Sequence, residues 1–314
     1  MSGPDQANRA ARRRFVAGLR PPSGIPAGGL EFRDGWRCAP AWGESSRPYL
    51  SYARPSEDAA WSNDHEALHE ESTRDHFIDV YTRRVGLGFL ADALANKAAP
   101  VLCDFGGSTG YFLEDLRAAA PTAVLAGADL IAQGLEKCHQ RLPGVMLFQL
   151  DVCDVPFQTR SLDALACINA LEHVERDDLA LKEFFRVLRP RGLAYIVVPS
   201  GPALYDYYDE VLLHYRRYSR GELIQKAAAA GFRVQRMTTL GWSLYPMFWL
   251  RKKLNRWRHG SSPIEAKREQ VVRDIAGTQD SRVGHLAMVV ERAVVGGVSL
   301  PFGIRQAALL AKPE

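Results

Sequence analysis

The chain has no cysteine pair at C-x-x-C spacing and no apolar run of the roughly 20 residues that a membrane-spanning helix needs. Its five cysteines are scattered through 314 residues, which indicates a reducing compartment rather than a disulfide framework. The net charge of +4 is small and does not require a nucleic-acid partner. These absences lead us to expect a cytoplasmic protein that does not bind nucleic acid.

Residues 1–48 lack sustained periodicity and are rich in Gly, Pro and Arg, so we expect a flexible or irregular N-terminal extension there. Arg12-Arg13-Arg14 is similar to a twin-arginine export signal. Arg20-Pro21-Pro22 follows, however, where such a signal needs a long apolar segment, so we do not expect export.

Residues 65–69 spell H-E-x-x-H, which on a helix places His65 and His69 on one face, as in zinc proteases. Asp75 lies at a spacing suited to a third ligand, but Ser72 stands where such enzymes have glycine, and the flanks are polar. We favour an N-terminal helical lid over residues 49–97 and predict no metal. A zinc protease is the alternative.

From residue 98 onwards, short apolar segments alternate with amphipathic ones. The apolar segments predict strands at 101–104, 123–128, 145–150, 162–168, 193–198, 232–240 and 304–311. Helices are predicted at 77–97, 132–141 and 178–188, and a further one starts after the turn at 106–110. This alternation indicates an α/β fold, a Rossmann-like seven-stranded and mostly parallel sheet with helices on both faces.

Polar residues stand at four successive strand ends. Because parallel strands present their carboxyl ends at one edge, Asp104, Asp129, Asp151 and Asn169 should converge on one crevice. Asp129 can accept hydrogen bonds from two ribose hydroxyls. Asp151 can accept from an exocyclic amine while the N–H of Val152 meets an adenine nitrogen, and Asn169 can contact an amino-acid group.

The turn after the first of these strands reads Asp104-Phe105-Gly106-Gly107-Ser108-Thr109-Gly110. It does not match G-x-G-x-x-G and lacks G-K-[ST], which disfavours a nicotinamide oxidoreductase and excludes a P-loop. It resembles D-x-G-x-G-x-G, the first motif of class I S-adenosylmethionine (SAM)-dependent methyltransferases, with Ser108 in place of the middle glycine.

Three later segments extend this resemblance in the family's order, over roughly residues 98–240. Residues 150–157 resemble D-x-x-x-L-P-F, residues 161–163 with 171–174 resemble S-F-D…L-E-H-V, and residues 185–192 resemble R-V-L-K-P-G-G. The chain resembles the small-molecule, ubiquinone-biosynthesis-like branch of this family. The resemblance implies SAM as cofactor, S-adenosyl-L-homocysteine as product, and a SAM-binding core over 98–240. The cofactor-binding residues that it implies are Asp104, Gly106, Gly107, Ser108, Gly110, Asp129, Leu130, Asp151, Val152 and Asn169.

The segment after the fifth strand is rich in aromatic and basic residues and borders the acceptor pocket in the resembled family. We expect the acceptor to be bound by Tyr205, Tyr208, His214, Tyr215 and Arg216. If the acceptor needs a base, His173 is the first candidate and His214 the second, with Glu172 third.

Residues 241–303 predict a helical insertion, and residues 304–314 the last strand of the core. An apolar and aromatic run over 241–250 is followed by basic clusters over 251–258, which suits an acceptor cap, a homodimer contact or peripheral membrane contact. We expect methyl transfer to an O or N atom, or a C atom, of a small-molecule or lipid-like acceptor in biosynthesis of a specialised metabolite. The alternative is a SAM-binding protein of this fold with a non-methylating or regulatory role.

Overall fold

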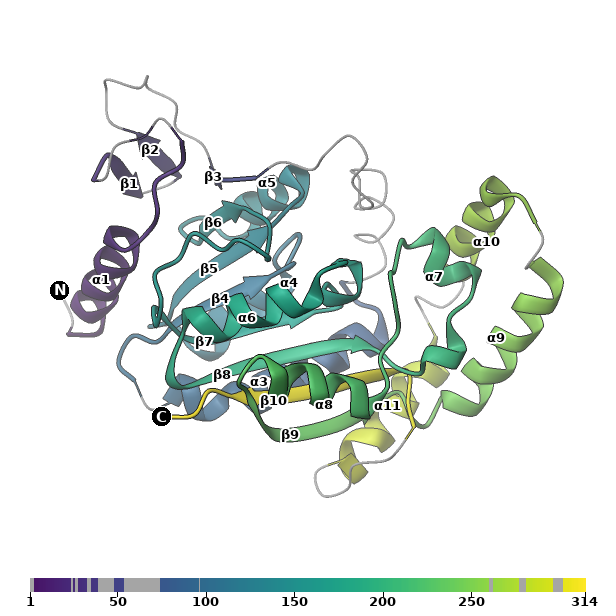
Figure 1. Ribbon diagram of the computed structural model, residues 1–314. Helices are drawn as coiled ribbons and strands as arrows, with labels where there is room; N and C mark the ends of the chain where they lie inside the picture. Colours follow the sequence, from purple (N-terminus) through teal and green to yellow (C-terminus); the bar gives the residue numbers. More distant parts are fainter. Residues whose placement is uncertain are drawn as a thin grey trace.

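The computed structural model describes residues 3–23, 25, 28–32, 35–38, 48–53, 74–95, 97–259, 262–276, 281–295 and 302–314. Its centre is an eight-stranded sheet in the order β3-β6-β5-β4-β7-β8-β10-β9 (Figure 1). The strands are β3 Leu50–Ser51, β4 Val101–Phe105, β5 Val124–Asp129, β6 Met146–Gln149, β7 Leu162–Ile168, β8 Leu188–Pro199, β9 Arg233–Leu240 and β10 Arg305–Ala311. The seven predicted strands are confirmed, and the two-residue β3 adds an eighth beside β6.

The sheet is parallel except at one edge, where β10 runs antiparallel to both β8 and β9. Strand β8 begins five residues before the predicted position of 193. Leu188 pairs with Leu162, and the register shifts between Leu162 and Ala164, so the polar Arg189-Pro190-Arg191 lies within the strand.

Helices cover both faces of the sheet, and therefore β4 is buried at every residue. One apolar cluster joins the sheet to α6 Asp177–Val187 and α8 Arg220–Ala229. The other joins it to α3 Phe77–Ala95, α4 Tyr111–Ala119, α5 Ala132–Arg141 and α11 Arg282–Val295. Gly86 of α3 allows the buried Tyr195 ring to approach, and the Tyr195 hydroxyl donates to the Thr82 carbonyl at 2.9 Å.

The expectation of a flexible or irregular extension is wrong for residues 3–17, which form helix α1 Gly3–Ala17. Ala11 and Phe15 of this helix are buried in the main core, and the Phe15 ring meets the edge of Phe157 at 5.0 Å between centroids. A short antiparallel pair, β1 Leu30–Phe32 and β2 Trp36–Cys38, follows. Arginines between the apolar positions of α1 concealed this helix in the sequence.

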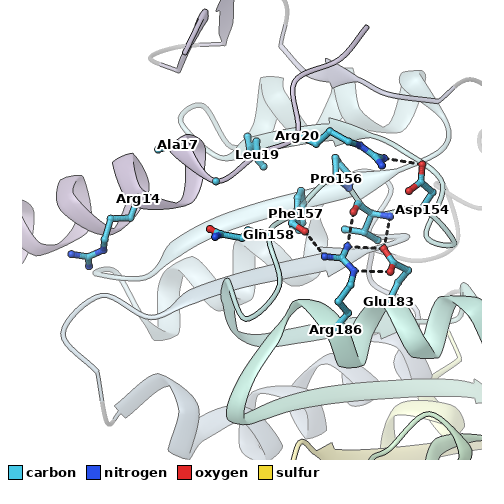
Figure 2. Close-up of a pocket in the computed structure, with 12 residues that line it drawn as sticks. Arg14, Ala17, Leu19, Arg20, Asp154, Pro156, Phe157, Gln158, Glu183 and Arg186 are labelled. Atoms are coloured by element: carbon cyan, nitrogen blue, oxygen red, sulfur yellow. Dashed lines mark hydrogen bonds and ion pairs between the residues drawn. The ribbon is translucent and has the colours of Figure 1, made fainter. Parts of the chain in front are cut away.

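The chain after α1 is tied to the loop that follows β6. Figure 2 shows Arg20 reaching Asp154, with 2.7 Å between Nη2 and Oδ2. Below it, Arg186 forms a two-point ion pair with Glu183 and donates to the carbonyls of Val155 and Phe157. The groove beside these residues, of about 850 Å³, contains none of the four polar strand-end residues.

The last group of helices lies beyond the carboxyl ends of the strands (Figure 1). It consists of α7 Tyr207–Val211, α9 Tyr245–His259 and α10 Ile264–Ala276. Val271 of α10 packs on Tyr207 and Val211 of α7. Glu291 of α11 anchors the start of the insertion, because it accepts the backbone N–H of Gly241 at 2.7 Å. In the part of the chain that the structure describes, no helix is both long and apolar enough to cross a bilayer.

Candidate active site

The glycine turn after β4 is held close to the end of β7. Gly106 has φ +72°, and a Cβ added to it would lie 2.3 Å from the Ala170 Cβ. Its N–H donates to the Ala128 carbonyl at 2.7 Å. Ser108 also adopts a positive φ, of +43°, at the position where the motif has its middle glycine. The serine therefore keeps the turn conformation of the motif at some backbone cost.

Asp129 closes β5 and fixes this turn. Its Oδ2 accepts the N–H of Ser108 at 2.9 Å, and its Oδ1 accepts the N–H of Ile131 at 3.0 Å. A carboxylate has about four acceptor sites, so Asp129 can hold the turn and also face a ligand. Asp129, Leu130, Asp151, Val152 and Asn169 all line one cavity of about 530 Å³, which we call the cofactor cavity. The structure thus brings together the strand-end residues chosen for an adenosyl group.

Asp104 lies under the turn, at a small extension of this cavity lined also by Gly106, Gly107, Ser108 and Asn169. It is 2% exposed, and a Cβ at Gly107 would lie 2.4 Å from its Oδ2. Burial, and then the charge of Asp129, raise the pKa of Asp104 to about 8. Among the described residues, none hydrogen-bonds its Oδ1. A buried carboxyl with an open acceptor atom fits a cationic ligand group, such as the ammonium of SAM.

A second cavity, of about 270 Å³, adjoins the first, and Asn169 and His173 line both. We call it the acceptor cavity. Its other walls come from the start of α3, from α7 and the segment after it, from α9, and from the start of β10. Its walls include Glu172, Tyr208, His214, Arg217, Phe248, Lys252 and Asn255.

His214, which is half-buried, and the buried Asp209 form a pair at this cavity. The Nδ1–H of His214 donates to Asp209 Oδ1 at 2.8 Å, which leaves Nε2 as the ring's acceptor atom. Burial lowers the pKa of His214 more than the hydrogen bond to Asp209 raises it, so the ring is neutral near pH 7. Asp209 also accepts from Arg217 Nε at 2.8 Å and from Lys252 Nζ at 3.0 Å. Burial opposes ionisation of Asp209, but these three donors lower its pKa well below the usual range.

His173 lies against this pair, with 4.7 Å between the His173 and His214 ring centroids at a steep angle. Glu172 is 1% exposed, burial raises its pKa to about 8, and none of the described residues hydrogen-bonds its Oε2. The potential ligand atoms of Glu172, His173 and His214 lie within 4.8 Å of one another. The three side chains can therefore serve either as proton carriers or as ligands of a divalent metal.

The remaining predicted acceptor residues are placed differently from one another. Tyr208 lines the acceptor cavity, whereas Tyr215 lines the cofactor cavity. The Tyr205 hydroxyl donates to the His214 carbonyl at 2.8 Å, and Tyr205 lines neither cavity. Arg216 also lines neither, because its Nη1 pairs with Asp177 Oδ2 at 2.8 Å. The neighbouring Arg217 lines the acceptor cavity, where Arg216 was predicted.

Asp209, Arg217 and Lys252 were missed by the sequence reasoning. One signal was present: Asp206 and Asp209 have the spacing of a capping box, which both side chains form at the start of α7. The H-E-x-x-H segment at 65–69 lies outside the described residues, so the zinc alternative is not tested by the structure.

Residues 103–196 match the family model described as "Methyltransferase domain". The chain is 36% identical over 129 residues to phthiotriol/phenolphthiotriol dimycocerosates methyltransferase of Mycobacterium leprae, covering 40% of this chain and 45% of that protein. It is 31% identical over 118 residues to fatty-acid O-methyltransferase of Mycolicibacterium smegmatis, covering 37% and 41%. The chain thus spans less than half the length of these two relatives.

The fold is similar to that of phosphoethanolamine N-methyltransferase 2 of Haemonchus contortus, solved in complex with SAM. That likeness has a TM-score of 0.52 at 15% identity and covers 82% of this chain and 59% of the other. The sheet order and the likeness to this structure show the class I methyltransferase fold, and the family model places a methyltransferase domain on residues 103–196. The chain contains a class I SAM-dependent methyltransferase domain, with SAM as the cofactor of that domain.

Proposed function

We propose that the protein transfers the methyl group of SAM to an oxygen or nitrogen atom of a small-molecule or lipid-like acceptor. The observation that carries this proposal is the pair of adjoining cavities that share Asn169 and His173. One has the acids that suit an adenosyl group, and the other has a histidine–aspartate pair. The relatives named for fatty acids and dimycocerosates support the lipid-like class of acceptor.

SAM supplies an electrophilic methyl group when it is bound. In the proposed arrangement, Asp129 holds the ribose hydroxyls, Asp151 and Val152 hold the adenine, and Asp104 with Asn169 holds the amino-acid end. The two cavities then align the acceptor with the methyl group and exclude water, which is the main task in an in-line displacement.

His214 is the residue that we propose as general base. Its neutral ring, held by Asp209, takes the proton that leaves the acceptor atom at Nε2, and Asp209 stabilises the imidazolium that forms. His173, at the junction of the cavities, positions the acceptor. We place the acceptor's apolar part against Tyr208 and Phe248.

The test is transfer of labelled methyl from SAM to a panel of hydroxylated lipids, lipids with an amino group and quinols. The proposal predicts a labelled product with at least one acceptor and a large loss of rate in Asp129→Ala. Asp154→Ala is the matched control, because Asp154 is exposed and its carboxylate pairs with Arg20. If the protein bound SAM but labelled no acceptor of the panel, the non-methylating alternative would be favoured.

A further inference from the structure

Helix α9 has two faces with different surroundings. Phe248, Lys252 and Asn255 line the acceptor cavity, and Lys252 is buried. On the other side, four apolar residues recur at spacings of three and four, which places them on one helix face. We call Met247, Leu250, Leu254 and Trp257 the α9 stripe; they are 62%, 53%, 41% and 82% exposed. Large apolar side chains thus face outwards on a helix that forms a wall of the acceptor cavity.

The charges of α9 all have one sign. The helix has no acidic residue and carries five Arg or Lys residues between positions 251 and 258. Lys253 and Arg258 are exposed near the two borders of the α9 stripe. The Lys253 ammonium lies 4.1 Å from the centroid of Trp249, which is itself 40% exposed. A basic helix with an outward apolar face and tryptophan beside it suits the surface of an anionic bilayer.

A second copy of the chain fits this face less well. A two-fold contact through the α9 stripe would bring the basic borders of two α9 helices together, with no acidic residue on either helix to offset the repulsion. The phosphate groups of anionic lipids provide the missing opposite charge, while the boundary of the acyl chains accepts the stripe.

We propose that α9 docks the protein on anionic lipid membranes through the α9 stripe, with Lys253 and Arg258 on the headgroups. The opposite face of the same helix lines the acceptor cavity, so docking places that cavity next to the lipid phase. The membrane contact is a binding property and does not depend on the proposed methyl transfer.

The test is flotation of the full chain with phosphatidylcholine vesicles, with and without phosphatidylglycerol. We expect binding to the phosphatidylglycerol vesicles that weakens with added salt. One basic side chain near an anionic surface contributes about fivefold, so Lys253→Glu with Arg258→Glu should weaken partition at least about 25-fold. Leu254→Ser with Trp257→Ser should weaken it at least about tenfold at unchanged charge.

Arg9→Glu with Arg13→Glu is the matched control. It makes the same change in net charge at exposed positions of α1, at the opposite end of the molecule (Figure 1), and should leave binding unchanged. Equal weakening by both charge pairs would mean non-specific attraction and overturn the proposal. Failure of the folded wild type to float with either vesicle would also overturn it. So would a dimer that forms without lipid and that the Leu254→Ser, Trp257→Ser variant dissolves.

Discussion

Replacing Asp104 by asparagine removes a buried ionisable carboxyl and keeps the size of the side chain. Asp104 lies under the glycine turn with an Oδ1 that none of the described residues hydrogen-bonds, and its ionised form faces the nearby charge of Asp129. Both conditions disfavour the charged state in the free protein. The asparagine side chain cannot ionise, so comparing the variant with the wild type isolates the free-energy cost of ionising Asp104.

The expected effect on stability follows from the two pKa values. Asp ordinarily ionises near 3.8, whereas the pKa of folded Asp104 is about 8. Below pH 3.8 both states hold the proton. Between these values the unfolded chain has lost a proton that the folded protein keeps, so rising pH favours unfolding. About 1.4 kcal/mol for each pH unit gives roughly 4 kcal/mol lost between about pH 5 and 8, as an upper value.

The assay is urea unfolding of the wild type and of Asp104→Asn at several pH values between these limits. The free energy of unfolding of the wild type, minus that of the variant, should fall as the pH rises. Subtraction cancels Glu172, whose pKa burial also raises to about 8. A difference that stays constant with pH would show that Asp104 is ionised in the folded protein, and would refute this account of the turn.

Three further predictions concern catalysis and the cofactor turn. His214→Gln should lower kcat about 10²- to 10³-fold with little change in SAM affinity, and an unchanged kcat would exclude His214 as base. In the wild type, the rate should fall at acid pH with a midpoint below 6.5, because burial lowers the pKa of His214. Treatment with EDTA should leave the rate unchanged if His214 takes the proton and His173 positions the acceptor, whereas a loss restored by a divalent metal would assign the Glu172–His173–His214 cluster to a metal. Gly107→Ala should weaken SAM binding in a titration, because its Cβ would lie 2.4 Å from Asp104 Oδ2, whereas Gly88→Ala, with open space around it, should bind SAM as the wild type does.

The strand-end residues could be predicted because their positions follow from local pattern and one topological rule. Apolar segments ending in Asp129, Asp151 and Asn169 indicate parallel strands, and parallel strands in one sheet end at one edge. The structure places these three on one cavity. Their binding of SAM stays a prediction.

The acceptor cavity could not be assembled in the same way, because its charged residues meet only through tertiary packing. Asp209 and Lys252 are 43 positions apart, and Lys252 stands in a stretch that otherwise looks like a surface helix. Whether Arg216 or Arg217 faces the cavity depends on the loop conformation after α7, for which the sequence shows no periodic signal. Helix α1 was missed for a similar reason. Phe15 stands among arginines in the sequence, and only the packing of the helix on the sheet shows that Phe15 is buried.

Calorimetric titration with SAM and S-adenosylhomocysteine, on the wild type, Asp129→Ala and Asp154→Ala, tests the central claim most directly. A hydrogen bond to a charged group contributes about 2 kcal/mol, so loss of the Asp129 carboxylate should weaken binding at least roughly 30-fold. We predict micromolar binding to the wild type and unchanged binding to Asp154→Ala. Asp129→Ala should bind at least roughly 30-fold more weakly. A folded wild type that binds neither ligand, or an Asp129→Ala that binds as the wild type does, would contradict the assignment of the cofactor cavity.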